Sequence, residues 1–282
     1  MSFLCRYMSL YTASLNSGSN GNCYYIGNGQ EAVLIDAGIS CRETEIRMAR
    51  LNLSMKTVKA IFISHEHGDH IKGVNVLSKK YNLPVYFTEP TFRYSRLSIA
   101  KPLVKMFRAG EPLSINGLNV TAFAKNHDAK DPHSFTVEGN GVTIGIFTDI
   151  GNVCNNLVHH FKRCDAAFLE ANYDNDMLEN GRYSAPLKQR IRGGMGHLSN
   201  DQALELFKAH KPAHMSHLFL SHLSADNNCP EIVSGMFNAH ADKVRIVIAS
   251  RHEQTEVYRI MSSSSNHTND FVMPKLRQAS LF

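Results

Sequence analysis

Two spacings of hydrophobic positions alternate along the chain, the short apolar runs of buried strands and the longer period of helices. Residues 134–149 form two apolar runs joined by Gly-Asn-Gly, which is typical of a β-hairpin. Apolar runs predict further strands at 31–38, 58–65, 85–89, 115–127, 165–172, 217–222 and 244–250, the last of these being the final strand. Helical spacing predicts helices at 71–81, 155–164, 198–210 (with Ser199 as N-cap) and 230–240.

The order of these elements favours an α+β protein. Strands occur both in a hairpin and in alternation with helices, which is typical of mixed sheets with helices on their outer faces. The 282 residues, 43% of them hydrophobic, suffice for one large core. We expect residues 1–8 to be an N-terminal extension, 9–262 a single domain, and 263–282 a flexible tail because it begins in a Ser- and Asn-rich segment.

Composition narrows the class of protein further. No apolar run approaches the roughly 20 residues that span a bilayer. The N-terminus has no extended apolar segment of a secretory signal, so we expect a cytoplasmic protein without membrane contact. The six cysteines form no Cys-x-x-Cys pair, which favours free thiols in a reducing compartment. A net charge of +5 favours an anionic partner only slightly.

The candidate chemistry is concentrated where the strand at 58–65 ends, in the sequence His-Glu-His-Gly-Asp-His. His65, His67, Asp69 and His70 place three imidazoles and a carboxylate within six positions. These ligand types together suit Zn²⁺, Mn²⁺ or Fe²⁺. The four side chains are too close along the chain to surround one ion, whereas two neighbouring ions could each take a pair. The segment therefore predicts a centre of two divalent metals.

His-x-His-x-Asp-His directly after a strand resembles the signature of the metallo-β-lactamase superfamily. The resemblance implies a four-layer αββα sandwich of two mixed sheets, with metals at one edge. It also implies that Asp36, in Leu-Ile-Asp-Ala-Gly, braces the metal loop without binding metal. The implied ligands are His65, His67, His127 and Asp149 for one ion, and Asp69, His70, Asp149 and His222 for the other.

Three other histidines, His214, His217 and His133, compete for these positions. His217 lies close to His222, but His222 ends an apolar run and His217 begins one. His133 competes less well with His127, because it follows Pro132 and does not end a strand. We therefore keep His127 and His222 as the predicted ligands.

Two divalent ions about 3.5–4 Å apart can hold a hydroxide between them as the nucleophile and stabilise the oxygens of an in-line displacement. That chemistry serves esters, thioesters, lactams and phosphodiesters alike, so the ligands indicate hydrolysis but not the substrate. True β-lactamases of this superfamily commonly carry Cys where Asp149 stands and are secreted. The Asp, together with the expected cytoplasmic location, disfavours β-lactamase activity.

His197 is the residue that favours phosphodiesters. It follows a Gly-rich turn, precedes a helix, and is not needed to complete either predicted metal site. It resembles the extra histidine of the phosphodiesterase branch, which includes RNase Z and PhnP-type enzymes. That resemblance implies a general acid, or a donor to a phosphate oxygen, and a histidine pKa near 6.5 suits proton donation at neutral pH. The alternative is a histidine that only bonds its own helix N-terminus.

Two loops are candidates for substrate contact. The first, preceding His197, contains Arg182, Lys188, Arg190 and Arg192 with no acidic residue among them, which predicts either a loop that grips a phosphate backbone or a solvated basic face. The second, 16–25, contains Ser17 and Asn20, and its amides could cradle a phosphate or simply form a tight hairpin.

Further segments resemble the YycJ/WalJ-like subgroup of the superfamily, among them Ser-Gly-Ser-Asn-Gly-Asn-Cys, Leu-Glu-Ala-Asn-Tyr-Asp and Gly-His-Leu-Ser-Asn-Asp-Gln-Ala. This resemblance implies a bacterial, cytoplasmic, metal-dependent exonuclease that degrades DNA from the 5′ end. About 70 residues separate Asp149 from His222, too few for the β-CASP domain of RNase J. No counterpart of the RNase Z exosite arm is evident either.

Our hypothesis is therefore a di-metal phosphodiesterase that acts on DNA rather than RNA, with Asp69 and His197 as its catalytic residues. A second hypothesis is a small-molecule hydrolase, either a cyclic nucleotide phosphodiesterase or a glyoxalase II-type thioesterase. A third is a binding protein with a decayed site, which the filled ligand positions disfavour.

Overall fold

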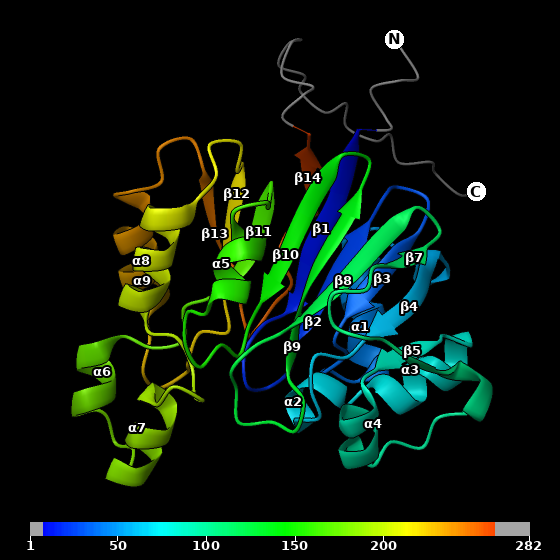
Figure 1. Ribbon diagram of the computed structural model, residues 1–282, viewed down its shortest axis with the longest axis horizontal. Helices are drawn as coiled ribbons and strands as arrows, with labels where there is room; N and C mark the ends of the chain where they lie inside the picture. Colours follow the sequence, from blue (N-terminus) through cyan, green and yellow to red (C-terminus); the bar gives the residue numbers. More distant parts are fainter. Residues whose placement is uncertain (1–7, 263–282) are drawn as a thin grey trace, which may run out of the picture.

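The computed structural model describes residues 8–262, which form two seven-stranded sheets packed face to face (Figure 1). The first sheet contains, in spatial order, β14 (Tyr258–Met261), β1 (Ser9–Asn16), β2 (Cys23–Gly27), β3 (Ala32–Ile35), β4 (Val58–Phe62), β5 (Val85–Phe87) and β6 (Val104–Met106). The second contains β13 (Arg245–Ile248), β12 (His217–Ser221), β11 (Ala166–Glu170), β10 (Val142–Phe147), β9 (His133–Gly139), β8 (Leu118–Ala124) and β7 (Leu113–Ile115).

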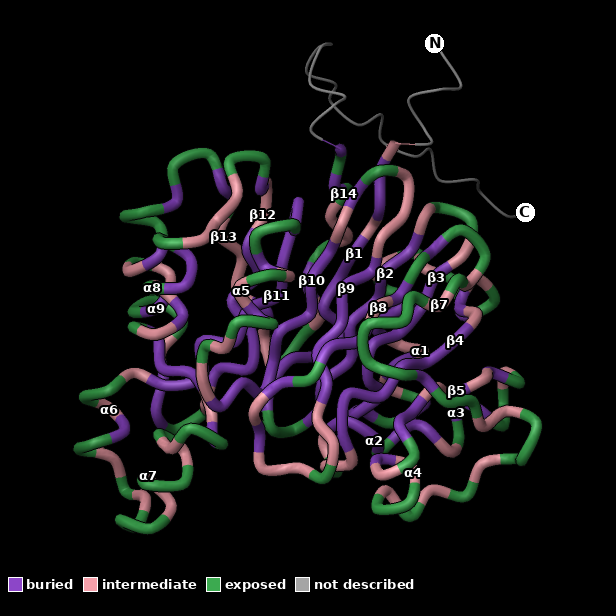
Figure 2. Tube along the Cα trace, viewed as in Figure 1, coloured by how far each residue is buried: buried purple, intermediate pink, exposed green. Residues whose placement is uncertain are grey.

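Both sheets are mixed, as the sequence predicted. Strands β14 to β3 pair antiparallel and β3 to β6 parallel, whereas β7 to β10 pair antiparallel and β10 to β13 parallel. The inner faces of the sheets share one buried apolar core that includes Tyr24, Phe62, Phe135 and Phe168 (Figure 2). Because parallel strands end at a common edge, residues that follow β3, β4, β10 and β12 come together there.

Helices cover the outer faces and complete the predicted αββα sandwich. On the first sheet they are α1 (Cys41–Arg50), α2 (Gly68–Ile71), α3 (Val74–Tyr81) and α4 (Glu89–Ser95), with the short 3₁₀ helices η2 (Met55–Thr57) and η3 (Lys101–Leu103). On the second they are α5 (Asn155–Phe161), α8 (Asn200–His210) and α9 (Pro230–Asn238). Two more, α6 (Asn175–Asn180) and α7 (Ala185–Arg192), lie at the edge where the site is.

The expectation that 244–250 is the final strand was wrong. β14 follows it and pairs antiparallel with β1, with Ser9 opposite Met261. β1 itself was not predicted, because its polar residues Ser9, Thr12, Ser14 and Asn16 are buried and remove the polar–apolar alternation of a half-exposed strand. The pairing therefore closes the sheet with segments from opposite ends of the sequence.

The limits of the domain stay a prediction. Residues 1–7 and 263–282 lie outside the described part of the chain, and with them nearly all of the predicted extension and the whole predicted tail. Among the residues that are described, no helix is both long enough and apolar enough to cross a membrane.

Candidate metal centre

The segment after β4 carries the first predicted ligands, and Asp36 holds it in place. Asp36 ends β3 and accepts hydrogen bonds from the backbone N–H of Ser64, from the Ser64 hydroxyl and from Nδ1 of His70, each at 2.8 Å. Gly38 then passes so close to the loop that a side chain there would meet the carbonyl oxygen of Asp69. A buried carboxylate and a missing side chain thus fix the position of the loop.

Three site residues have a left-handed backbone directly after their strands. Asp36, Asp149 and His222 have φ values of 59°, 56° and 56°. Such angles are uncommon for residues other than glycine and persist only where the surroundings impose them. Each strand therefore ends in a tight turn that brings its last polar side chain into the same place.

Each of three histidines uses one ring nitrogen for a hydrogen bond within the protein and leaves the other for the centre. Nδ1 of His70 bonds Asp36, Nδ1 of His127 donates to the carbonyl of Gly196 at 3.0 Å, and Nδ1 of His222 lies 2.8 Å from the Glu170 carboxylate. This arrangement is typical of metal-binding histidines, whose second nitrogen is held by a carboxylate or carbonyl.

The atoms that face the centre fit a cation. Nε2 of His127, Nε2 of His222 and Oδ2 of Asp149 are buried and have no hydrogen-bond partner among residues 8–262, a costly state unless something binds them. Asp149 is central, because its oxygens lie 3.2 Å from Nε2 of His70 and 3.5 Å from Nδ1 of His222. All seven predicted ligands fall in groups whose ligand atoms lie within 4.8 Å of one another: His65, His67 and His127; Asp69, His70 and His222; His65, His70 and Asp149.

The charge of the centre also favours a cation. Burial alone would lower the pKa of His222, yet Asp149, Asp69 and Glu170 raise it to about 10. Burial likewise opposes the charge of Asp149, but His222 and His70 hold the pKa of its carboxyl well below the usual range. The carboxylates therefore attract protons to the imidazoles when nothing else compensates them. Divalent metals compete for the same nitrogens, so metal binding should release protons.

Glu170 is a functional residue that the sequence analysis missed. It ends β11 fully buried and accepts hydrogen bonds from the backbone N–H groups of Asp149, Ile150 and Leu198 at 3.2, 2.7 and 3.1 Å. It also bonds Nδ1 of His197 at 2.9 Å and Nδ1 of His222 at 2.8 Å. These neighbours outweigh burial and lower its pKa to about 2, so the ionised Glu170 can only accept and both histidines must donate.

Asn22 and Lys125 were missed as well. The Asn22 amide donates to Asp69 at 3.2 Å and lies 3.1 Å from Nε2 of His70, so it touches two predicted ligands. Lys125 is buried and donates to the carbonyl of Thr148 at 2.7 Å, next to Asp149. The only sequence signal for either was its place beside a predicted motif, and that signal does not distinguish a ligand contact from an ordinary loop residue.

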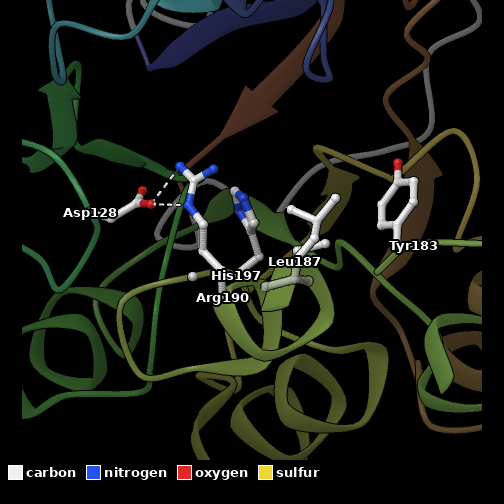
Figure 3. A pocket seen from close by; sticks show the side chains of 7 residues that line it. Asp128, Tyr183, Leu187, Arg190 and His197 are labelled. Carbon is white, nitrogen blue, oxygen red and sulfur yellow. Dashed lines mark hydrogen bonds and ion pairs between the residues drawn. The ribbon is translucent and has the colours of Figure 1, made fainter. Parts of the chain in front are cut away.

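His197 lies against the ligand cluster and faces a cavity. Its ring centre is 5.3 Å from that of His127 and 5.2 Å from that of His222. Because Nδ1 donates to Glu170, Nε2 is left for a substrate. The cavity has a volume of about 200 Å³ and is lined by Asp128, Tyr183, Leu187, Arg190, Ile191, Gly196 and His197 (Figure 3). His197 thus has Nδ1 held by a carboxylate and a cavity alongside, and its catalytic role stays a prediction.

Three residues of the basic run before His197, Lys188, Arg190 and Arg192, lie on the helix α7, not on the predicted loop, and already have partners. Arg190 binds Asp128 through Nε at 2.6 Å and Nη2 at 2.5 Å (Figure 3). Arg192 binds the Glu179 carboxylate at 2.9 Å, and Lys188 donates to the Glu179 backbone carbonyl. Arg182 lines a separate cavity with Tyr183 and Asp226. The acids come from outside the run, so inspection of the run alone could not reveal them.

The second predicted contact loop connects β1 and β2, which pair as a hairpin. The hydroxyl of Ser17 accepts the backbone N–H of His222 at 2.8 Å, and Ser17 is buried. The Asn20 amide donates to the carbonyl of Arg251 at 2.8 Å and accepts from Asn16. Ser17 thus holds the backbone of His222, Asn20 joins its loop to Arg251, and a role of either in phosphate binding stays a prediction.

The fold and the cluster of His and Asp side chains define a metallo-hydrolase, and comparison with known proteins agrees. The family model described as "Beta-lactamase superfamily domain" matches residues 31–222, and the chain belongs to this superfamily. It is 35% identical over 228 residues to "Exodeoxyribonuclease YycJ" of Bacillus anthracis, covering 80% of this chain and 86% of that protein. It is 31% identical over 223 residues to "Exodeoxyribonuclease WalJ" of Streptococcus pneumoniae, covering 77% and 83%.

Solved structures show the same fold at lower identity. The metallo-β-lactamase fold protein YhfI from Bacillus subtilis superposes with a TM-score of 0.70 at 16% identity, covering 89% of this chain and 99% of that one. The relatives are named as exodeoxyribonucleases, and the chain is accordingly a hydrolase of this superfamily whose His and Asp clusters indicate divalent metal binding.

We predict that Glu170→Gln lowers kcat by roughly 10- to 100-fold and leaves KM unchanged. Glu170 accepts five hydrogen bonds, whereas an amide has only one acceptor oxygen and cannot accept them all. The amide also adds two donors, so its N–H₂ would face the N–H of a histidine. Steady-state kinetics on a phosphodiester substrate measures the effects on kcat and on KM separately. Glu170→Asp keeps the charge and should recover part of kcat; equal rates for the Gln variant and the original protein would contradict this role.

Proposed function

We propose that the protein is a metal-dependent nuclease that degrades DNA from its 5′ end in the cytoplasm. The observation that supports it best is His197, which Glu170 orients at 2.9 Å and which lines a cavity beside the ligand cluster. The names of the relatives, YycJ and WalJ, support DNA as the substrate. Since these relatives share about a third of their residues with the chain, their activity is brought to it as a proposal.

In this proposal each residue has a defined role. His65, His67, His127 and Asp149 would hold one ion, and Asp69, His70, Asp149 and His222 the other, with Zn²⁺, Mn²⁺ or Fe²⁺ as candidates. When bound, two divalent ions supply the Lewis acidity that activates a water and offsets the charge of the phosphate.

The catalytic roles fall on Asp69 and His197. Asp69 is held by the Asn22 amide at 3.2 Å with its side chain 22% exposed, so it can contact a water at the centre. His197 donates Nδ1–H to Glu170, and its Nε2–H would give a proton to the departing oxygen of the phosphodiester. Glu170 stays ionised and holds the imidazole of His197 in that orientation.

A small phosphodiester remains the second candidate, because the cavity beside His197 is only about 200 Å³ and the α7 cations next to it are already paired. Polymer and small substrates therefore have to be compared in one experiment.

We expect Mn²⁺-loaded protein to remove nucleotides stepwise from 5′-phosphorylated duplex DNA, since the paired ligand groups and His197 suit phosphodiester hydrolysis. A time course of end-labelled duplex should be run beside matched single-stranded DNA, RNA and bis(4-nitrophenyl) phosphate. Endonucleolytic products or degradation from the 3′ end would contradict the 5′ polarity. Cleavage of the small diester alone, by protein shown to hold metal, would favour the second candidate.

A further inference from the structure

A basic segment lies next to the metal loop and has no part in the site described above. Between Glu89 and Glu111 the chain carries five basic residues and no acidic one, an excess equal to the net charge of the whole chain, +5. All five are exposed. Within residues 8–262, only one of them, Arg108, makes an ion pair, 3.9 Å from Glu111. The other four form no ion pair within that range.

One of these cations, Arg93, and Lys130 from a neighbouring loop lie against an exposed aromatic ring, that of Tyr94. The guanidinium of Arg93 lies 6.0 Å, and Nζ of Lys130 4.8 Å, from the ring centre of Tyr94. Tyr94 is 51% exposed, and Arg96 follows directly at the end of α4. We call Arg93, Tyr94, Arg96 and Lys130 the α4 patch. Cations grouped around an open aromatic face suit a chain of phosphates and bases.

The α4 patch adjoins the metal loop. The backbone N–H of Lys130 donates to the carboxylate of Glu66 at 2.9 Å, and Glu66 stands between the predicted ligands His65 and His67. The hydroxyl of Thr91 on α4 bonds the carbonyl of Asp131 at 3.3 Å, which joins the helix to the same loop. Figure 1 shows α4 and α7 at one end of the molecule, on opposite sides of α2. A strand bound at the centre could therefore extend over α4.

The nearby acids do not neutralise the α4 patch. Glu66 accepts the backbone N–H of Lys130, and Asp131 lies 3.9 Å from His133. On α7, by contrast, Arg190 and Arg192 are paired with Asp128 and Glu179. A paired cation must give up its partner before it binds phosphate, whereas an unpaired one exchanges only counterions and water. Arg93, Arg96 and Lys130 are thus cations beside the metal loop that form no ion pair among the described residues.

We propose that the α4 patch binds the phosphate backbone of the DNA substrate beside the scissile bond, with Tyr94 stacking on a base or sugar. This inference rests on the proposed nuclease function and adds the surface that holds the polymer. It assigns to α4 the contact that the sequence suggested for the basic run of α7. Small phosphodiesters would reach the metal centre without touching the patch.

The test compares two triple variants that remove the same charge. Arg93→Gln with Arg96→Gln and Lys130→Gln neutralises the patch. Lys162→Gln with Lys208→Gln and Lys243→Gln is the control, because these lysines are exposed and make no ion pair in the described chain. They lie at the C-terminal ends of α5 and α8 and just before β13, away from the site. The metal-loaded full chain is used throughout.

We expect the patch variant to raise KM for duplex DNA at least about tenfold. The plot of the logarithm of the DNA-binding constant against the logarithm of salt concentration should become less steep by about two to three, at ~0.9 per lost phosphate contact. The rate on bis(4-nitrophenyl) phosphate and the thermal midpoint should stay as in the original protein. The control should match the original protein in every measurement. Tyr94→Ala should weaken DNA binding about fivefold or more, and Tyr94→Phe should restore it.

The outcomes separate this inference from the function on which it rests. If the original protein cleaves DNA and the patch variant keeps its KM and salt slope, the patch assignment is wrong and the nuclease function stands. Equal losses in both triple variants would show a general charge effect and also overturn the patch. If the original protein neither binds nor cleaves DNA, the proposed function falls and the patch proposal with it.

Discussion

Asp149→Asn is expected to lower hydrolysis by at least about a thousandfold and to release metal on dialysis. Asp149 lies between both ligand groups, 3.2 Å from His70 and 3.9 Å from Nε2 of His127, so a neutral amide there would weaken both predicted sites. Metal ions supply several kcal/mol of charge stabilisation, and about 1.4 kcal/mol corresponds to a factor of ten in rate. Asn tolerates a φ of 56°, so the turn after β10 should survive.

The matched control for this variant is Asp165→Asn. Asp165 is also buried, and it accepts the backbone N–H of Thr143 at 2.8 Å, at the start of β11 and thus away from the metal centre. Metal content and the rates on DNA and on bis(4-nitrophenyl) phosphate should fall in Asp149→Asn and stay unchanged in Asp165→Asn. An Asp149→Asn protein that kept its metal and its rate would remove Asp149 from the centre.

The predicted ligands could be found because the information that specifies them is local. His65, His67, Asp69 and His70 fall within six positions, and His127, Asp149 and His222 each follow an apolar run. The strand ends converge because, within each mixed sheet, the strands that precede the predicted ligands run in the same direction. The sequence therefore predicted which residues would meet, and the structure brings all seven into groups of neighbouring ligand atoms.

Glu170 and Asn22 could not be found in this way, because their contacts are with distant segments. Glu170 collects N–H groups from the turn after β10 and from the start of α8, and its role is visible only once those turns are placed. A buried acid at the end of an apolar run, as in Phe-Leu-Glu, is the signal to look for, since such a charge needs several donors to be tolerated.

The missed elements have a related cause. β1 has buried polar side chains, α1 is strongly charged, and Arg47 on its inner face is buried and bonds the carbonyl of Leu15 and the side chain of Asn16. Some polar residues of these elements bond partners far along the chain, as Thr12 bonds the carbonyl of Tyr25 and Arg47 that of Leu15. A pattern that equates polar with exposed therefore fails for such elements.

His197→Ala is expected to lower kcat on DNA by roughly 10²- to 10⁴-fold while leaving the metal content intact. The imidazole is 23% exposed, borders the cavity of about 200 Å³, and is held at Nδ1 by Glu170 at 2.9 Å, so only Nε2 can reach a departing oxygen. The alkoxide that leaves from DNA needs a proton, whereas nitrophenolate leaves without one. The same variant should therefore lose far less activity on bis(4-nitrophenyl) phosphate.

This difference between leaving groups distinguishes proton donation from the other roles His197 could have. A metal ligand would take metal with it and reduce both reactions, and a helix cap would reduce neither at a temperature where the protein is folded. His217→Ala provides the control, because His217 is half-buried at the opposite end of β12 from His222. Equal losses on both substrates, with metal retained, would assign His197 to binding the phosphate oxygens and not to the departing group.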